Sequence, residues 1–286
     1  MQIIKTIDLT NINSQIAQGR LTLTSNTPVL SSNVTNATTI FYTPYNGSQI
    51  SIWDGSKWSV RTFTELSLSL SGLSANTNYD VFIYDNAGTL TLEAVAWSNS
   101  GAGTSARASA LSWLNGVRVK DSDKRKYLGS FRTTGTTGQT EFSFYQYASL
   151  ITVKPFLINE FNREKYHIKF VDPTNTSYST GTYRLYRASS NACIQLLLIE
   201  SKSIDFYLRS SALAHRINIS INNSIVFDRS GTNDGTWDTG STSSNLTVSN
   251  FKNYFNLIGY NEFYLIEYGY VNASVGDVSM SIKEEF

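Results

Sequence analysis

The chain has 286 residues, with 23 basic side chains against 22 acidic ones, and it contains one cysteine. This balance of charge argues against nucleic-acid binding proteins, which carry a strongly basic face, and against proteins held at membranes by a polybasic patch. A single cysteine excludes an intrachain disulfide framework, and no apolar stretch approaches the roughly 18 residues of a membrane span.

Residues 1–19 stand outside the regular pattern that follows. The stretch IIKTIDLT predicts one strand and NINSQIAQ a short helical turn. Such a terminal segment suits either an anchor to a neighbouring chain or a frayed end, because termini are poorly ordered unless they are held. It lacks the apolar core of a signal peptide, so we expect synthesis in the cytoplasm.

Residues 20–98 alternate apolar and polar side chains, which predicts short antiparallel strands. Asp54-Gly55-Ser56 predicts one hairpin turn and Asp85-Asn86-Ala87-Gly88 a second, because glycine supplies the positive φ of tight turns. Strands this short and this regularly spaced indicate an all-β sandwich or barrel-like domain.

The pattern changes after residue 98. ARASALSWL at 106–114 predicts a short helix ended by Asn115-Gly116, and the charged run at 121–126 predicts a solvated hairpin tip. TTGTTGQT at 133–140 has no apolar residue, so we expect a linker there, with a domain boundary near residue 140.

Residues 141–286 predict a second all-β domain, a jelly-roll-like sandwich of antiparallel strands. IQLLLIE at 194–200 is apolar on both faces and predicts a central buried strand. Residues 228–245 read as a polar loop, and 249–270 predict a short helix followed by a strand.

The first half of the chain resembles a module of tailed-bacteriophage virion proteins and of prophage-encoded tail or fibre proteins. The resemblance covers 20–141 and lies in four ordered stretches: RLTLTS, FYTPYNGSQISIWDG, NYDVFIYDNAGTLTLEAVAW and YLGSFRTTGTTGQTE. It implies a component of the virion, without saying which part. The second half carries only weak echoes of such proteins.

No catalytic grouping stands out in the sequence, so we expect a non-enzymatic protein with no catalytic residues, no cofactor and no metal site. Cys193 lies among apolar residues and is expected to be a buried thiol. His167 and His215 alternate with apolar neighbours and are expected to be structural. The loop at 228–245 is rich in Asp and Asn but lacks the spacing of a calcium loop.

Aromatic side chains near turns are the best candidates for contact with a glycan or a partner. Trp53 and Trp58 flank one hairpin turn and are expected to pack against it. Trp237 stands alone in a polar loop, and it forms the predicted contact set together with three tyrosines of the C-terminal region, Tyr254, Tyr260 and Tyr264.

The sequence therefore predicts a structural component of a tailed-phage virion, fibre or tail-associated. The alternatives are a head-decoration or head-fibre protein, a glycan-binding receptor-recognition module and, least favoured, a tail depolymerase. Expected partners are other virion proteins and copies of the same chain, with a trimer favoured. A host surface glycan is a further candidate partner, whereas nucleic acid and membrane insertion are not expected.

Overall fold

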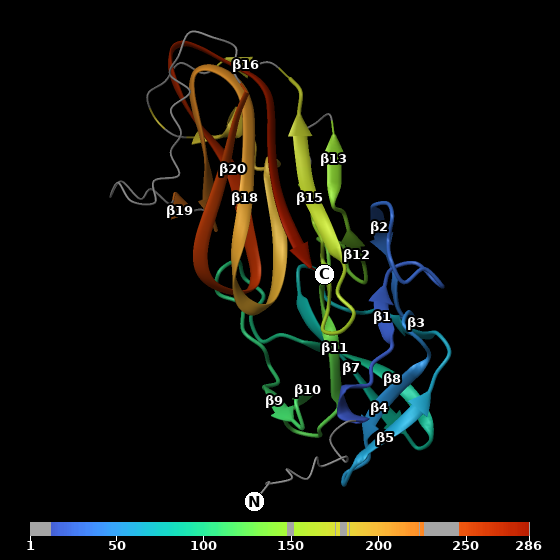
Figure 1. Ribbon diagram of the computed structural model, residues 1–286. Coiled ribbons are helices and arrows are strands. Elements are labelled where there is room, and N and C mark those ends of the chain that lie inside the picture. Colours follow the sequence, from blue (N-terminus) through green and yellow to red (C-terminus); the bar gives the residue numbers. More distant parts are fainter. Residues whose placement is uncertain are drawn as a thin grey trace, which may run out of the picture. The chain divides into compact units, whose positions relative to one another are not determined.

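The computed structural model describes residues 13–147, 152–174, 176–177, 182, 184–222, 224–225 and 246–285. Within these ranges, only the backbone is described for 176–177, 201–218, 224–225, 246–256, 266–279 and 283–285. The regular secondary structure of the described residues is almost entirely β-strand, which confirms the predicted all-β class (Figure 1).

The chain divides into two compact units, and the division is not a single cut. Unit 1 comprises 1–100, 106–141 and 157–164, and unit 2 comprises 101–105, 142–156 and 165–286. Each unit therefore contains a short segment that lies, in sequence, within the other.

Unit 1 is built of short strands, most of them three to nine residues long. They are β1 (Gly19–Thr22), β2 (Val34–Ala37), β3 (Thr39–Pro44), β4 (Gln49–Trp53), β5 (Trp58–Thr62), β6 (Leu66–Ser69), β7 (Asn78–Asn86), β8 (Thr89–Ala96), β9 (Leu111–Leu114), β10 (Val117–Lys120), β11 (Lys126–Arg132) and β14 (Leu157–Asn159), with β12 (Thr140–Phe142) at the passage to unit 2.

Four sheets organise these strands: β1-β3-β6, the hairpin β4-β5, the pair β12-β2, and β8-β7-β11-β10-β9, with β14 added on β11. Both predicted hairpins are confirmed. Trp53 pairs with Trp58 across the first turn, where Gly55 has φ 101°, and Asn86 pairs with Thr89 across the second. β7 and β11 fill the centre of the six-stranded sheet of unit 1, where Phe82, Tyr127 and Phe131 are fully buried.

The predicted helix at 106–114 is wrong. Residues 111–114 form β9, which pairs in register with β10. Asn115 and Gly116 have φ 52° and 81°, so they form a two-residue turn of positive φ between strands instead of a helix end. An Asn-Gly pair is compatible with a helix C-terminus and with a hairpin turn. The hairpin forms here because residues 111–114 pair with Val117–Lys120.

Two further expectations for unit 1 need correction. Lys126, expected at a solvated tip, is completely buried at the start of β11. The expected linker at 133–140 is a tight turn: Thr134 N donates to Gln139 O at 2.8 Å, and Gly138 N donates to Leu73 O at 2.9 Å. Backbone hydrogen bonds hold this polar segment in place without apolar side chains.

Unit 2 has one seven-stranded sheet of order β13-β15-β20-β18-β19, with β16 and β17 also paired to β20. The strands are β13 (Tyr145–Tyr147), β15 (Lys165–Asp172), β16 (Thr176–Ser177), β17 (Arg184–Leu185), β18 (Cys193–Ile221), β19 (Ser224–Ile225) and β20 (Leu246–Glu285), with a 3-10 turn, η2 (Tyr186–Ala188), after β17.

The strands β18 and β20 are long and bend along their length (Figure 1). Leu208 of β18 pairs with both Ser249 and Met280, so this part of β18 lies between the first and last parts of β20. The stretch Ile194–Ile199 is buried apart from Gln195, which confirms the central strand. The helix expected at the start of 249–270 is wrong, because β20 is extended there.

Candidate functional site

The structure describes the side chains of two of the four residues predicted to contact a glycan or partner. Trp237 lies outside the described residues, and Tyr254 lies in β20, where only the backbone is described. Tyr260 and Tyr264 also lie in β20, two residues on either side of Glu262. Tyr260 is 6% exposed, and its ring meets that of Phe156 edge-on at 6.2 Å.

Glu262 collects the hydroxyl groups of both tyrosines. Tyr260 Oη donates to Glu262 Oε1 at 2.5 Å, Tyr264 Oη donates to Oε2 at 2.8 Å, and Gln195 Nε2 donates to Oε1 at 3.1 Å. Burial, together with the hydrogen bond to Glu262, raises the pKa of Tyr264 above its ordinary value. Both tyrosine hydroxyls are thus engaged within the sheet.

The cysteine of the chain lies at the start of β18. Cys193 is buried as expected, and burial raises the pKa of its thiol well above the ordinary value. Among the described residues, no group of three or more His, Cys, Asp and Glu side chains is placed to hold a metal ion. Nor does the described part of the chain contain a helix that is long and apolar enough to cross a membrane.

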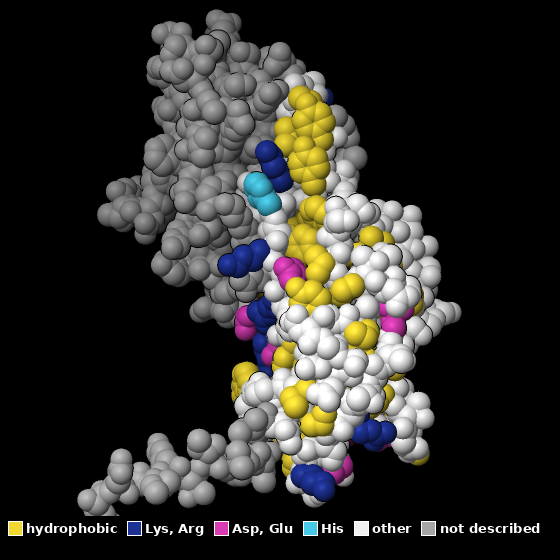
Figure 2. Space-filling model, turned by 45° about the vertical axis from the view of Figure 1, so that its right-hand side comes forward, with side chains coloured by type: hydrophobic (Ala, Val, Ile, Leu, Met, Phe, Trp, Pro, Cys, Tyr) yellow, Lys and Arg dark blue, Asp and Glu magenta, His cyan; other side chains and the backbone are white. Residues whose placement is uncertain are grey.

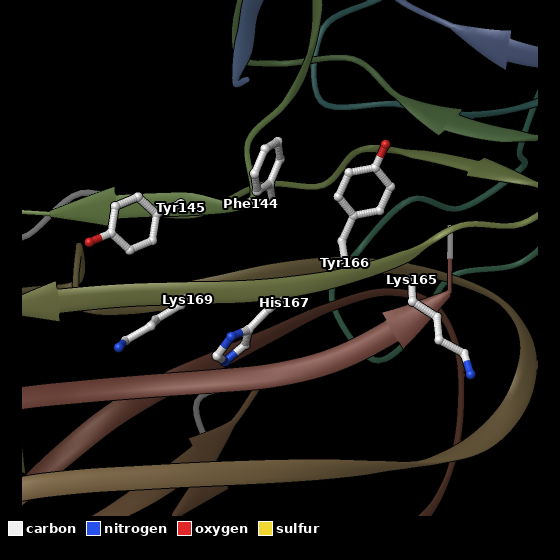
Figure 3. A pocket seen from close by; sticks show the side chains of 6 residues that line it. All are labelled: Phe144, Tyr145, Lys165, Tyr166, His167 and Lys169. Carbon is white, nitrogen blue, oxygen red and sulfur yellow. The ribbon is translucent and has the colours of Figure 1, made fainter. Parts of the chain in front are cut away.

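A depression of about 490 Å³ lies on unit 2 where β13 and β15 run side by side. Its lining residues combine aromatic and basic side chains: Phe144, Tyr145, Lys165, Tyr166, His167 and Lys169. We call it the β13–β15 depression (Figure 3). Aromatic rings beside cations are a combination that binds polar ligands with an apolar face.

The alternation of β15 explains the basic part of the lining. Lys165, His167 and Lys169 occupy one face of the strand, whereas Tyr166, Ile168 and Phe170 are buried on the other. The neighbouring strand β13 is parallel to β15, with Tyr145 opposite Lys169 and Tyr147 opposite Val171. The two tyrosines of β13 therefore stand on the same face as Lys169.

The base of the depression is a cluster of packed rings. Phe144 lies 5.2 Å from Tyr166, and Phe142 lies 5.0 Å from Tyr166, between ring centroids. Lys169 N donates to Phe144 O at 2.8 Å, which fixes the start of β13 on β15. Figure 3 shows the rings of Phe144 and Tyr166 on one side of β15 and the side chains of Lys165, His167 and Lys169 on the other.

Exposure distinguishes the two outer tyrosines. Tyr145 is 47% exposed and Tyr147 is 58% exposed, although aromatic rings usually bury most of their surface. Figure 2 shows hydrophobic side chains (yellow) gathered beside a basic side chain (dark blue) and the one histidine whose side chain is described (cyan). Two neighbouring exposed rings make this face a candidate contact surface.

Sequence reasoning missed this depression. The signal was present in FSFYQYASL, where Tyr145 and Tyr147 alternate, and in KYHIK, where basic residues alternate. Neither stretch by itself predicts the parallel pairing that brings the two together. His167, for which the sequence predicts a structural role, is one of the lining residues.

No protein-family model and no curated protein matches this chain. Among solved structures, the chain is similar to that of infectious bursal disease virus, Gx strain, with a TM-score of 0.29 and 10% identity. The match covers 88% of this chain and 71% of the viral chain. A likeness of this degree carries no argument about fold or function.

Proposed function

We propose that this protein is a non-enzymatic structural component of a tailed-phage virion. The observation that carries the proposal is the pairing of the stretches that resemble phage virion proteins. NYDVFIYDNAGTLTLEAVAW forms β7 and β8, YLGSFR lies in β11, and β11 pairs with β7 along its length. The resembling stretches thus form neighbouring strands of one unit, as parts of a common module would.

The protein content of purified particles tests this proposal. Particles of the phage, or of the induced prophage, that encodes the chain are purified by density gradient and digested for mass spectrometry. Peptides of this chain are expected in amounts that correspond to several copies per particle, with the portal complex, present once per particle, as the reference. Their absence from particles, with the chain present in the lysate, contradicts a virion role.

Within the virion, we favour a fibre or tail-associated position over a head decoration. Soluble oligomers are usually symmetric, and by analogy with fibre-like proteins we expect a homotrimer. Sedimentation equilibrium of the full chain then gives three times the monomer mass, and a monomer at micromolar concentration contradicts the trimer.

Glycan recognition is the second candidate function, and the β13–β15 depression favours it. Tyr260 and Tyr264, whose hydroxyls bind Glu262, are less suited to this contact than the exposed Tyr145 and Tyr147. Trp237 stays a candidate from sequence alone. A depolymerase is the least favoured alternative: it predicts release of reducing sugars from host polysaccharide, and a flat time course excludes it.

A further inference from the structure

We propose that the β13–β15 depression binds an acidic glycan, held by ring stacking on Tyr145 and by the positive charges of β15. The inference rests on glycan recognition, the second candidate function above, and adds to it the chemical class of the ligand. Three features of the depression support it: its exposed rings, its fixed base and its charge.

The exposed rings supply the stacking surface. Tyr145 and Tyr147 are two residues apart on one strand, so their Cα atoms are separated by about 6.6 Å. The face of an aromatic ring is electron-rich and attracts the weakly positive C–H groups on the face of a sugar ring. A tyrosine also offers a hydroxyl to sugar hydroxyl groups, which suits a ligand that is apolar on its faces and polar at its edges.

The fixed base holds the strand that carries these rings in place before a ligand arrives. Phe142, Phe144 and Tyr166 pack against one another beneath the surface, and the Lys169 N to Phe144 O hydrogen bond joins the two strands. Binding then requires little ordering of the protein, and this increases the affinity gained from a shallow contact.

The charge of the depression selects the ligand. Lys165, His167 and Lys169 line it, and none of its six lining residues is acidic. Along the backbone register of β20, Lys283 stands opposite His167 and Glu285 opposite Lys165. The resulting excess of basic groups favours carboxylate or sulfate substituents over a neutral sugar chain.

Single-stranded nucleic acid also combines ring stacking with cation contacts. It requires a basic groove that follows the backbone phosphates, whereas this chain has a net charge of +1 and the depression holds two lysines. The acidic glycan is therefore the better match, and an oligonucleotide belongs in the test.

The test measures binding of the full chain to immobilised polygalacturonate, dextran sulfate and polysialic acid. Two further probes are carboxyl-reduced polygalacturonate, which keeps the sugar chain but loses the charge, and oligothymidylate. We expect binding to at least one acidic polymer, weaker binding as salt rises, and weaker binding to the carboxyl-reduced polymer than to polygalacturonate if the latter binds.

Variants locate the site. Replacing both exposed tyrosines, Tyr145→Ala with Tyr147→Ala, should weaken binding at least about tenfold, since alanine offers no ring face for a sugar to stack on. Lys165→Gln with Lys169→Gln should reduce both affinity and salt dependence. Trp113→Ala is the matched control, because Trp113 is an exposed ring (70%) on β9 of unit 1, and it should bind as the unchanged protein does.

Each outcome decides a different point. Equal binding to charged and carboxyl-reduced polymers keeps glycan recognition and overturns the acidic preference. Binding to no polymer, or binding that the tyrosine variant retains while its thermal unfolding is unchanged, overturns the site. Tighter binding to oligothymidylate than to every glycan also overturns it. The virion proposal is unaffected by these results, since particle composition tests it separately.

Discussion

Lys126 Nζ donates a hydrogen bond of 2.9 Å to the main-chain carbonyl of Ser14, 112 residues earlier in the chain. A second hydrogen bond of 2.8 Å runs from the same amine to Ile16 O. The rings of Phe161 and Trp58 lie 5.0 Å and 5.4 Å from the amine. A buried amine thus holds the segment that precedes β1, and burial lowers its pKa to about 7.

We predict that the stability of the protein rises with pH because of Lys126. In the unfolded chain the amine keeps its proton up to about pH 10.5, whereas in the folded protein it loses the proton near pH 7. Between these values the unfolded state binds more protons, so unfolding becomes less favourable as pH rises, by up to about 1.4 kcal/mol per pH unit. Urea unfolding at pH 6 to 10 measures this slope.

Lys126→Met provides the comparison. The methionine fills a similar volume but does not titrate, so the difference in unfolding free energy between the two proteins should change across this pH range. A constant difference from pH 6 to pH 10 contradicts a folded-state pKa near 7.

We predict that adding a single methyl group at Gly129 strongly destabilises unit 1. Gly129 lies at a bulge in β11, with φ 151°, and a Cβ there would lie 2.1 Å from the main-chain oxygen of Ile158 in β14. Because the obstacle is backbone, Gly129→Ala should destabilise unit 1 by more than about 3 kcal/mol. Thermal unfolding of the purified variant measures the loss.

Gly88→Ala is the matched control for that change. Gly88 also has a positive φ, of 95°, but a Cβ there meets no atom within 4 Å. Its cost should be limited to the backbone strain of about 1–2 kcal/mol. Equal losses in the two variants would show that the approach of β14 to β11 is not as close as described.

The buried ion pair of unit 1 predicts a large loss when one partner is removed. Arg107 Nε lies 3.0 Å from Asp80 Oδ2, and the Asp80 side chain is 2% exposed. Ser130 Oγ donates to Asp80 Oδ1 at 2.6 Å. Arg107→Met leaves this carboxylate without its cation, at a cost of about 3–5 kcal/mol in unfolding free energy.

The unfolding free energy lost in Arg107→Met should be smaller at low pH than at neutral pH. Burial raises the pKa of Asp80 although Arg107 opposes the rise, so the variant should hold the Asp80 proton to higher pH. The folded variant then binds more protons than its unfolded chain, and its stability falls as pH rises. Arg61→Met is the control, because its pair with Asp85 is partly exposed and should contribute less than about 1 kcal/mol. Equal, pH-independent losses contradict this account.

Local patterns predicted the all-β class and the hairpins of unit 1 well. Gly55 and Gly88 each supply a positive φ at a hairpin turn. In each hairpin the turn glycine lies within a few residues of the alternating strands that it joins. Such information is local, so the sequence carries it directly.

Pairing over long distances could not be predicted in this way. The stretch around Trp113 has helix-compatible residues, but its pairing with β10 determines a strand. Lys126 reads as one of three consecutive basic residues, and only the path of the segment at Ser14 and Ile16 explains its burial. The β13–β15 depression likewise depends on a parallel pairing between strands about 20 residues apart.

Immunogold labelling of purified virions tests the central claim most directly. An antibody raised against the folded full chain is applied to intact particles and viewed by electron microscopy. A fibre or tail-associated protein predicts gold at the tail or its fibres in particles that carry the gene, and none in particles from a deletion strain. Gold spread over the head, or no gold on particles whose tails are intact, contradicts that placement.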